Sequence, residues 1–591
     1  EYYKWNQWLF IQLYKKGMAY RKKAPVNWCP SCSTVLANEQ VESDGTCERC
    51  GTMVERKSLT QWFYKITNYA DELLDGLKTI EWPEKTKLMQ ENWIGKSFGT
   101  EVTFKIIDHD KEIKVFTTRP DTLFGVTYLV MAPELELVQE LTTEENKESV
   151  NAYIESIKSL SEIERTSTVK EKTGVPIGAY AVNPVNGEKV PIWIADYALA
   201  SYGTGSVMAV PGHDERDFEF ATKFELPIRK VIWEDDTDVE APLTEAYTEI
   251  GTMVNSGQFS DLRSDAGKEK ITEWLEEKGE GKKKINYRLR DWLISRQRYW
   301  GTPIPIIYCD DCGEVLVPED QLPVELPYEV DFKPDGGSPL ASNKDFVNTT
   351  CPQCGGIAKR DVDTMDTFVD SSWYYLRYLD PNVSDVMFDS KLANSWTPVG
   401  MYVGGAEHAT MHLLYARFIH KFIRDIGLVN SDEPFQRLIH QGTITNQGAK
   451  MSKSKDNVVN PDIFIDEYGS DVFRMYLMFM GPYELGGDWS DKGIVGVDRF
   501  VQKSYVLFTS NADLSNQVSS KVKFEINNLS DVEKNIYRKV NQSIAKIDIE
   551  IEHFRFNTAV AALMELMNTL KDLNKCSEDI KFYSLERFAL M

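Results

Sequence analysis

The sequence predicts a multidomain α/β protein, and three observations support this fold class. Residues 361–445 alternate short strands and helices, as in a doubly wound sheet, whereas residues 96–287 combine alternating strands with charged helices. Eight of the nine cysteines fall in Cys-x-x-Cys pairs, which indicates two small cysteine-rich insertions. From about residue 500 onward only helical patterns are evident. These patterns predict an α/β core, an inserted α+β domain, two cysteine-rich insertions and a C-terminal α-helical bundle.

The individual elements follow from the spacing of apolar residues. Helical spacing predicts helices in residues 1–20 and 61–80, and charged helices in residues 135–165 and 264–279. Alternating or wholly apolar runs predict strands at VTFKII (102–107), IKVFTT (113–118), VTYLVMAP (126–133) and SVMAVP (206–211).

Composition limits the location and the partners of the protein. Of the 591 residues, 42% are hydrophobic and 12% aromatic, which suffices for several domain cores. No apolar run approaches the roughly 18 residues of a membrane-spanning helix, and residues 1–20 resemble neither a signal peptide nor a transit peptide. We therefore expect a cytoplasmic protein with no membrane partner, and we also expect a monomer. The net charge of −24 argues against a generally basic surface, but it leaves room for a local basic track.

Residues 282–298, KKKINYRLRDWLISRQR, form one such basic track. Its seven lysines and arginines accompany a single acid, Asp291. The track predicts either a local nucleic-acid contact or a solvated, charged helix face.

The eight paired cysteines form two quartets with metal-ligand spacing. Two-residue spacing lets a tight turn aim two thiolates at one tetrahedral ion, and the flanking Pro and Gly residues favour such turns. Disulfides are disfavoured because no secretion signal is present, and four redox motifs in one chain would be unusual. We predict structural Zn²⁺ with a closed coordination sphere, held by Cys29, Cys32, Cys47 and Cys50 and by Cys309, Cys312, Cys351 and Cys354.

Six stretches of the sequence resemble leucyl-tRNA synthetases, which are class I aminoacyl-tRNA synthetases. They are TTRPDTLFG (117–125), GTGSVMAVPGHDERD (203–217), RLRDWLISRQRYWGTPIP (288–305), MDTFVDSSWYYLRY (365–378), MYVGGAEHATMHLLYARF (401–418) and AKMSKSKDNVVNP (449–461). The resemblance covers essentially the whole chain, and the stretch GGAEHATMHLLYARF favours the leucyl family over its isoleucyl and valyl relatives. It implies ATP- and Mg²⁺-dependent activation of leucine, transfer to tRNA(Leu), and hydrolytic editing of mischarged tRNA.

The resemblance also implies how domains divide the chain. A partial Rossmann-type catalytic core is interrupted by an α+β editing domain and by two zinc-knuckle insertions. The expected segments are a core helix (1–26), the first zinc knuckle (27–60), a connection (61–95), the editing domain (96–287), a return to the core (288–308), the second zinc insertion (309–360), the second Rossmann half (361–445), the KMSKS loop and stem-contact region (446–500), and a truncated anticodon-binding helical bundle (501–591).

In this family a mobile Lys-Met-Ser-Lys-Ser loop stabilises the charge that builds on pyrophosphate. Lys450 and Lys453 match its catalytic lysines, Met451 would anchor the loop by packing, and Ser452 would hydrogen-bond backbone or phosphate. A solvated Lys/Ser turn is the alternative interpretation. Many relatives have glycine at the position where this chain has Asp456.

By the same resemblance, an apolar cup with polar anchors binds leucine. Gly404 and Gly405 would let the backbone approach the adenosine of ATP. His408 and His412 are four residues apart and would share one helix face, with a pair of core histidines or a metal site as alternatives. The residues expected in the cup are Phe368, Ser371, Tyr374, Tyr402, Glu407, His408 and His412.

The inserted domain carries the motifs of an editing site. In the family pattern, threonines bond a terminal ribose and a hydrolytic water, and an arginine holds RNA phosphate. Thr122 would exclude the correct leucyl group by size, and Asp217 would pair with the α-ammonium. Ordinary β-propensity is the alternative for the threonines, and helix capping for Asp214 and Asp217. The expected editing residues are Thr117, Thr118, Arg119, Asp121, Thr122, Met208, Val210, Asp214 and Asp217.

The family's other phosphate-binding motif, His-x-Gly-His, does not occur in the 591 residues, because no two of the seven histidines are three positions apart. We expect that motif to precede residue 1, and we expect this stretch alone to form no leucyl-adenylate. Leucine-dependent ATP–pyrophosphate exchange by the 591-residue chain would contradict this expectation. An autonomous aminoacyl-tRNA deacylase and a non-catalytic tRNA-binding protein are the alternative functions.

Overall fold

The computed structural model describes residues 2–591 except 38–39, 43, 158–164, 166–170, 201–202, 235–241, 332–337, 453–455 and 514–523. Its internal contacts divide the chain into two compact units. The first unit comprises Glu1–Ile80, Glu84–Pro398 and Ala409–Pro434, and the second comprises Glu81–Pro83, Val399–His408 and Phe435–Met591.

Near the start of the chain, a helix accompanies a small antiparallel sheet. Helix α1 spans Tyr3–Lys15, and the sheet has the order β13-β3-β1-β2, with β1 at Ala19–Cys29, β2 at Thr34–Leu36, β3 at Glu55–Tyr64 and β13 at Trp292–Leu293. The helix predicted for residues 61–80 is therefore wrong in its first part, since the α-helix in this region is α2, Ala70–Gly76. Trp62 and Tyr64 are buried in β3 because the whole strand pairs with β1, and aromatic residues favour such half-buried strands.

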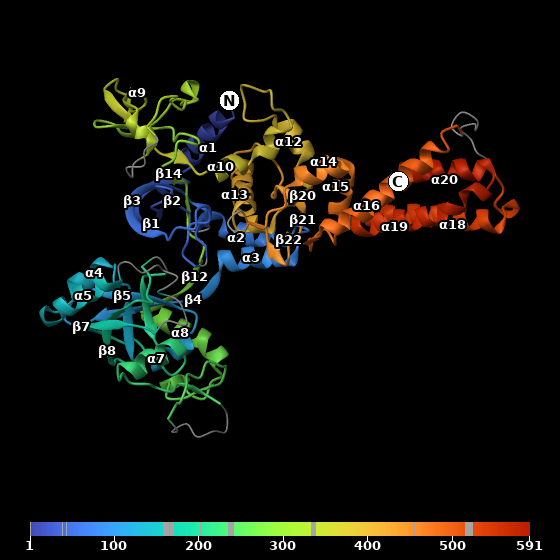
Figure 1. Cartoon of the computed structure of the whole chain (residues 1–591). Coiled ribbons are helices and arrows are strands. Elements are labelled where there is room, and N and C mark those ends of the chain that lie inside the picture. Colours follow the sequence, from blue (N-terminus) through green and yellow to red (C-terminus); the bar gives the residue numbers. More distant parts are fainter. Residues whose placement is uncertain are drawn as a thin grey trace. The chain divides into compact units, whose positions relative to one another are not determined.

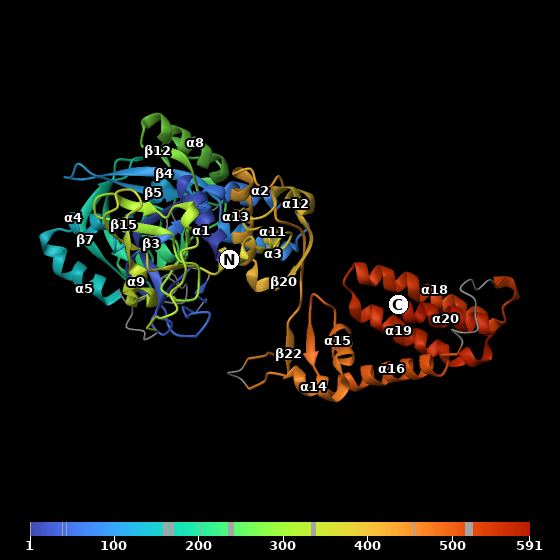
Figure 2. The same ribbon diagram turned by 90° about the horizontal axis from the view of Figure 1, so that it is seen from above.

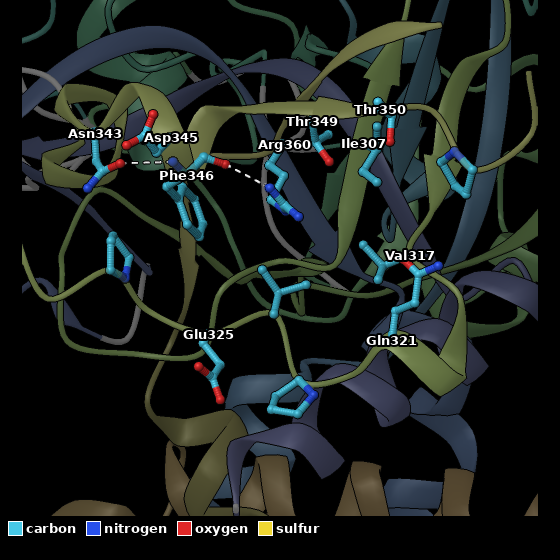
Figure 3. A pocket seen from close by; sticks show the side chains of 14 residues that line it. Ile307, Val317, Gln321, Glu325, Asn343, Asp345, Phe346, Thr349, Thr350 and Arg360 are labelled. Carbon is cyan, nitrogen blue, oxygen red and sulfur yellow. Dashed lines mark hydrogen bonds between the residues drawn. The ribbon is translucent and has the colours of Figure 1, made fainter. Parts of the chain in front are cut away.

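The second cysteine-rich insertion is a four-stranded antiparallel sheet. Its order is β16-β15-β18-β17, with β15 at Ile306–Cys309, β16 at Gly313–Leu316, β17 at Asn348–Thr350 and β18 at Ile357–Arg360. A cavity of about 390 Å³ lies beside these strands, and Figure 3 shows Arg360 and Phe346 among its lining side chains. Arg360 donates a hydrogen bond of 3.0 Å to the carbonyl of Phe346, which ties helix α9, Lys344–Val347, to β18.

The inserted domain is built on a seven-stranded mixed sheet with helices packed on it (Figure 1). The strand order is β12-β4-β7-β8-β6-β9, and β5 pairs with β4. The strands are β4 (Ser97–Ile106), β5 (Glu112–Thr117), β6 (Tyr128–Met131), β7 (Gly174–Val182), β8 (Lys189–Ala195), β9 (Ser206–Ala209) and β12 (Gly281–Asn286), and the helices are α4 (Glu136–Leu141), α5 (Lys147–Ile157), α7 (Glu215–Lys223) and α8 (Ser264–Lys278). The four strands predicted here are confirmed. Within the charged stretch 135–165, the described residues include helices α4 and α5, and residues 158–164 lie outside the described residues.

The basic track does not form a helix. It begins as strand β12, where Lys282 and Lys284 both contact the carboxylate of Glu101 on β4. Further along the track, Arg296 is buried and pairs with Asp366 at 2.5 Å. The alternative of a solvated, charged helix face is therefore wrong.

The remainder of the first unit packs around helix α13, His412–Asp425. The helices that contact it include α2, α3 (Glu84–Ile94), α10 (Phe368–Ser371) and α11 (Tyr374–Arg377), and helix α12 (Ser390–Trp396) belongs to the same unit. The guanidinium of Arg417 on α13 is fully buried and contacts Glu433 and Gln90, each at 2.7 Å. Lys421 pairs with the same Glu433 carboxylate at 2.8 Å. Because buried charges persist only when they are paired, this network fixes α13 against α3.

The second unit begins with a parallel strand pair and ends in helices. Strands β20 (Val399–Gly404) and β21 (Phe435–His440) pair in parallel, as a doubly wound sheet requires. They are followed by β22 (Ile444–Asn446), β23 (Ala449–Lys450), α14 (Pro461–Tyr468), α15 (Ser470–Phe479), β24 (Gly487–Trp489), α16 (Asp491–Thr509), α18 (Asp531–Glu552), α19 (Phe556–Thr569) and α20 (Glu578–Leu590). Helices α18, α19 and α20 lie side by side in Figures 1 and 2 (red), around a core that includes Ile536, Val540 and Leu566.

The predicted fold class is confirmed. An α/β core, an inserted α+β domain, two cysteine-rich sheets and a terminal helical bundle are all present. No strand occurs among the described residues after 500, as the sequence predicts. Within the described ranges, none of the helices combines the length and the apolar character that crossing a bilayer demands.

Candidate functional site

The end of strand β5 opens onto a cavity of about 670 Å³ in the first unit. One part of its wall comes from residues at and after the end of β5, and a second part comes from β9 and the start of helix α7. The lining residues are Phe116, Thr117, Thr118, Arg119, Thr122, Tyr197, Leu199, Val207, Met208, Val210, His213, Asp214, Arg216, Asp217, Arg288 and Arg290. Every residue predicted for an editing site is in this set except Asp121.

The first wall is held rigidly by its own hydrogen bonds. The backbone N–H of Arg119 donates to Oγ1 of Thr117 at 3.0 Å, and the Thr122 hydroxyl donates to the carbonyl of Arg119 at 2.9 Å. Asp121 is fully buried behind this wall, where it accepts hydrogen bonds from Nε of Arg119 at 3.0 and 3.1 Å. Asp121 therefore orients the guanidinium of Arg119 and does not itself line the cavity.

The second wall centres on the carboxylate of Asp217. Asp214 caps helix α7 by accepting the backbone N–H of Asp217 at 3.0 Å, so the capping interpretation is correct for Asp214, although this residue also lines the cavity. Oδ2 of Asp217 accepts the backbone N–H of Val210 at 2.8 Å, and Oδ1 lies 3.3 Å from the guanidinium of Arg216. Burial raises the pKa of Asp217 to about 7, and the cation of Arg216 only partly opposes this effect.

Arg216 and Tyr197 are site residues that motif reading missed. The guanidinium of Arg216 stands 4.5 Å from the ring centre of Tyr197 while it contacts Asp217, so an aromatic face and a carboxylate together fix its position. The sequence signal was its place between Asp214 and Asp217 in the stretch GHDERD.

Two arginines of the basic track, Arg288 and Arg290, also line the cavity. With Arg119 and Arg216 they give it four guanidinium groups, which are suited to phosphate oxygens. These two arginines lie in the middle part of the track, which follows strand β12, and the nucleic-acid interpretation of the track stays a prediction.

His213 orders the loop that carries the second wall. Its Nδ1 donates to the carbonyl of Tyr247 at 2.8 Å, and its Nε2 accepts the backbone N–H groups of Val231 and Ile232 at 2.9 and 3.1 Å. Burial lowers the pKa of His213 to about 4, so the imidazole is neutral at pH 7. Because both ring nitrogens are engaged, His213 has a structural role.

The residues predicted for leucine and ATP are divided between the two units. Phe368, Ser371, Tyr374 and His412 belong to the first unit, whereas Tyr402, Gly404, Gly405, Glu407, His408 and the KMSKS loop belong to the second. The rings of Tyr374 and His412 lie 6.3 Å apart, and Tyr402 stacks on Phe435 at 3.8 Å.

The prediction that His408 and His412 share a helix face is wrong. His408 ends the 3-10 turn Ala406–His408, and α13 begins only at His412, because the chain between them is not helical. The metal alternative for this pair has no support, since among the described residues only the two cysteine quartets gather enough ligand atoms.

The base of the KMSKS loop is fastened by an asparagine. Asn457 accepts the backbone N–H of Ser452 at 2.8 Å and donates to the carbonyl of Lys450 at 3.2 Å. Met451 packs against an apolar cluster around Trp489, whereas Lys453 lies outside the described residues. Asp456 has a left-handed backbone with φ of 51°, a conformation that glycine adopts freely and that aspartate tolerates better than most residues.

Each cysteine quartet brings its four sulfur atoms within 4.8 Å of one another. Sγ of Cys29 lies 3.4 Å from Sγ of Cys50, and Sγ of Cys309 lies 3.6 Å from Sγ of Cys354. All nine cysteines are free thiols, and these spacings are far beyond a disulfide bond of about 2.05 Å. Four converging thiols are a donor set that suits a tetrahedral zinc ion.

Two family models match the chain. The model described as "tRNA synthetases class I (I, L, M and V)" matches residues 1–97 and 258–487, and the model described as "Leucyl-tRNA synthetase, editing domain" matches residues 91–276. With the parallel strand pair and the inserted sheet, these matches define a class I aminoacyl-tRNA synthetase that carries an editing domain.

Individual relatives narrow the class further. The leucine–tRNA ligase of Clostridium tetani is 57% identical over 585 residues, which are 98% of this chain and 70% of the relative. The leucine–tRNA ligase of Clostridium beijerinckii is 58% identical over 583 residues, with the same shares of 98% and 70%. A crystal structure of a ternary complex of Agrobacterium radiobacter K84 LeuRS, tRNA and LeuAMS has a TM-score of 0.86 and 41% identity, over 99% of this chain and 70% of that one. The chain belongs to the leucine–tRNA ligase family.

Proposed function

We propose that the 670 Å³ cavity hydrolyses mischarged aminoacyl-tRNA(Leu), as the editing activity that accompanies the ligase reaction. The observation that carries this proposal is the buried carboxylate of Asp217, which shares the cavity with the threonines at the end of β5. Each part of the aminoacylated 3′ end of the tRNA then has its own set of contacting residues in the cavity.

The charged parts of the substrate meet charged groups. Asp217 pairs with the α-ammonium of the amino acid, which is the one cation at that end of the substrate. Arg119, Arg216, Arg288 and Arg290 are the cavity's candidates for the RNA phosphates.

The neutral parts meet hydroxyl and apolar groups. Thr117 and Thr118 contact the terminal ribose and a water molecule, while Met208 and Val210 face the amino-acid side chain. Water adds to the ester carbonyl, the ester C–O bond breaks, and the ribose oxygen takes up a proton that the water releases. The products are a free amino acid and uncharged tRNA.

Thr122 sets which side chain is accepted. Binding alone separates similar apolar side chains by only about 1–3 kcal/mol, so a second, hydrolytic site must reject the correct leucyl group. Thr122 is 2% exposed and its hydroxyl is held by the backbone, which makes it a fixed steric boundary. A leucyl group that meets this boundary is not placed for attack by water.

For the ligase reaction we propose tRNA(Leu), leucine and ATP with Mg²⁺ as partners, with Lys450 and Lys453 acting on the phosphates. Met451 and Ser452 would hold the loop, as the contacts of Ser452 with Asn457 support. The leucine cup, the cytoplasmic location and the monomeric state stay predictions.

We also propose one structural Zn²⁺ in each cysteine quartet. In each quartet two cysteines are buried and one is exposed, and four thiolates leave no ligand position for water. Such an ion would cross-link the strands and turns of each insertion, and around the first quartet the buried apolar cluster is small.

The test of the editing proposal is release of isoleucine from isoleucyl-tRNA(Leu). The chain is expected to release it well above the spontaneous rate. A Thr118→Trp variant fills the cavity at an exposed position and should lose this activity, whereas Lys114→Ala, on β5 but outside the cavity, should keep it. Hydrolysis that Thr118→Trp leaves unchanged would place the activity elsewhere.

A further inference from the structure

Strands β1 and β3 present a ribbon of lysines that the editing and ligase sites do not use. Residues 19–29 and 55–65 contain six basic side chains and one acid, Glu55, in a chain where acids outnumber bases by 91 to 67. The six are Arg21, Lys22, Lys23, Arg56, Lys57 and Lys65.

Three of these lysines gather on one face of the ribbon over aromatic rings. Nζ of Lys57 lies 4.1 Å from the ring centre of Trp28, and Nζ of Lys22 lies 5.1 Å from that of Phe63. The ammonium of Lys65 lies 5.4 Å from the ring centre of Tyr20. The strand register puts these groups on the same face of the sheet, because Tyr20 pairs with Phe63 and Val26 pairs with Lys57, and side chains an even number of positions apart along β1 point to one face.

The ammonium groups of this lysine face are available to a partner. Lys22, Lys57 and Lys65 form no ion pair with any residue that the structure describes, in contrast to the lysines of β12, which pair with Glu101. Two acids border this face: Glu55 pairs with Trp28 at the start of β3, and Asp291 accepts the hydroxyl of Tyr20 at 2.8 Å. The face therefore keeps a positive charge inside an acidic protein.

Two of the three aromatic rings under the lysines are closed to stacking, whereas Tyr20 is half-buried. Trp28 is 3% exposed and Phe63 is 8% exposed, so neither ring offers a surface for a base. The face offers cations without base readout, and this combination fits a phosphodiester backbone rather than particular bases.

We infer that the lysine face, Lys22, Lys57 and Lys65, binds the phosphate backbone of the tRNA. This inference rests on the proposed function, which makes tRNA(Leu) the polyanion that the chain meets. Contact with phosphates is independent of base sequence and releases counterions, so its signature is a dependence of affinity on salt.

The test compares the salt dependence of tRNA(Leu) affinity among three variants of the 591-residue chain. Replacing all three lysines by glutamine should lower the slope of log Kd against log salt by about 2 to 3. Replacing them by arginine keeps the charges and should keep the slope. The matched control replaces Lys105, Lys111 and Lys114 by glutamine, since each of these pairs with a glutamate in the inserted domain.

The outcomes separate this inference from the proposed function. The inference is supported if the salt-dependence slope falls in the glutamine variant but is kept in the arginine and control variants. The thermal unfolding of the glutamine variant must also be unchanged. An equal slope and Kd in the glutamine variant would overturn the inference and leave the face to another partner, such as an acidic protein segment, while editing stands. If the unmodified chain binds no tRNA(Leu), both proposals fall.

Discussion

Asp217→Asn removes the charge on which the proposed editing chemistry depends and preserves the shape of the side chain. In the structure Oδ2 accepts the Val210 N–H at 2.8 Å, and an asparagine oxygen can accept the same bond. In the variant, the side chain at position 217 no longer attracts the guanidinium of Arg216, 3.3 Å away, or the substrate ammonium through a negative charge.

The magnitude follows from the burial of this carboxylate. Asp217 is only 2% exposed, and removing one partner of a buried charge pair costs about 2–5 kcal/mol. At 1.36 kcal/mol for each factor of ten, kcat/KM for deacylation should fall by roughly 30- to 5,000-fold. Single-turnover release of isoleucine from isoleucyl-tRNA(Leu) measures this loss.

The same variant tests the role of ionisation. Because burial raises the pKa of Asp217 to about 7, the free enzyme gains its carboxylate, and with it the ammonium site, as the pH rises through 7. Deacylation, corrected for spontaneous ester hydrolysis, should rise over that interval and show no such rise in Asp217→Asn. Stability changes in the opposite direction, since a raised carboxyl pKa favours the folded state at low pH and this contribution is lost towards pH 7.

Asp265→Asn provides the matched control. Asp265 is an exposed aspartate of helix α8 in the same domain, so its replacement should leave deacylation unchanged. At pH 8 the unfolding temperature of the Asp217→Asn chain should be no lower than that of the unmodified chain, because the variant no longer buries a negative charge at this position. Deacylation by a folded Asp217→Asn chain within threefold of the unmodified rate would refute the ammonium-pairing argument.

Three further changes probe the gate, the zinc and the core. Thr122→Ala should begin to hydrolyse correctly charged leucyl-tRNA(Leu), and continued sparing of that substrate would exclude the gate. Cys47→Ser should lower the bound zinc by about one ion per chain in a metal-release assay, whereas unchanged zinc content would disprove the first quartet as a ligand set. Glu433→Gln leaves Arg417 and Lys421 buried with too little countercharge, which should cost about 3–5 kcal/mol in urea unfolding. A loss below about 1 kcal/mol would show that water or another group compensates them.

The sequence predicted best where a local pattern is sufficient. Alternation of apolar residues identified strands of the inserted sheet, and Cys-x-x-Cys spacing identified quartets whose sulfur atoms do converge. The stretches TTRP and GHDERD supplied the candidate editing residues, and the structure brings residues of both stretches to a single cavity.

Prediction failed where tertiary pairing decided the outcome. Residues 61–64 carry helical spacing, but β1 recruits them as a strand through backbone hydrogen bonds that no local pattern reveals. His408 and His412 have the spacing of helix neighbours, yet α13 starts only at the second of them.

Three residues could be interpreted only from the folded geometry. Asp121 belongs to the TTRPD stretch but faces Arg119 from behind the cavity wall. Arg216 is positioned by the ring of Tyr197. Because Tyr197 lies outside the stretch GHDERD, the motif does not reveal this contact. Asp456 is understood only once its positive φ is known.

The most direct measurement of the central claim is the ratio of two deacylation rates, for isoleucyl-tRNA(Leu) and leucyl-tRNA(Leu), catalysed by the same 591-residue chain. If Thr122 bounds the cavity and Asp217 binds the α-ammonium, the isoleucyl ester is hydrolysed and the leucyl ester is spared. The rate for the isoleucyl ester should then exceed the rate for the leucyl ester by about tenfold or more. Equal rates for the two esters, or no hydrolysis above the spontaneous rate, would contradict the assignment of this cavity as the editing site.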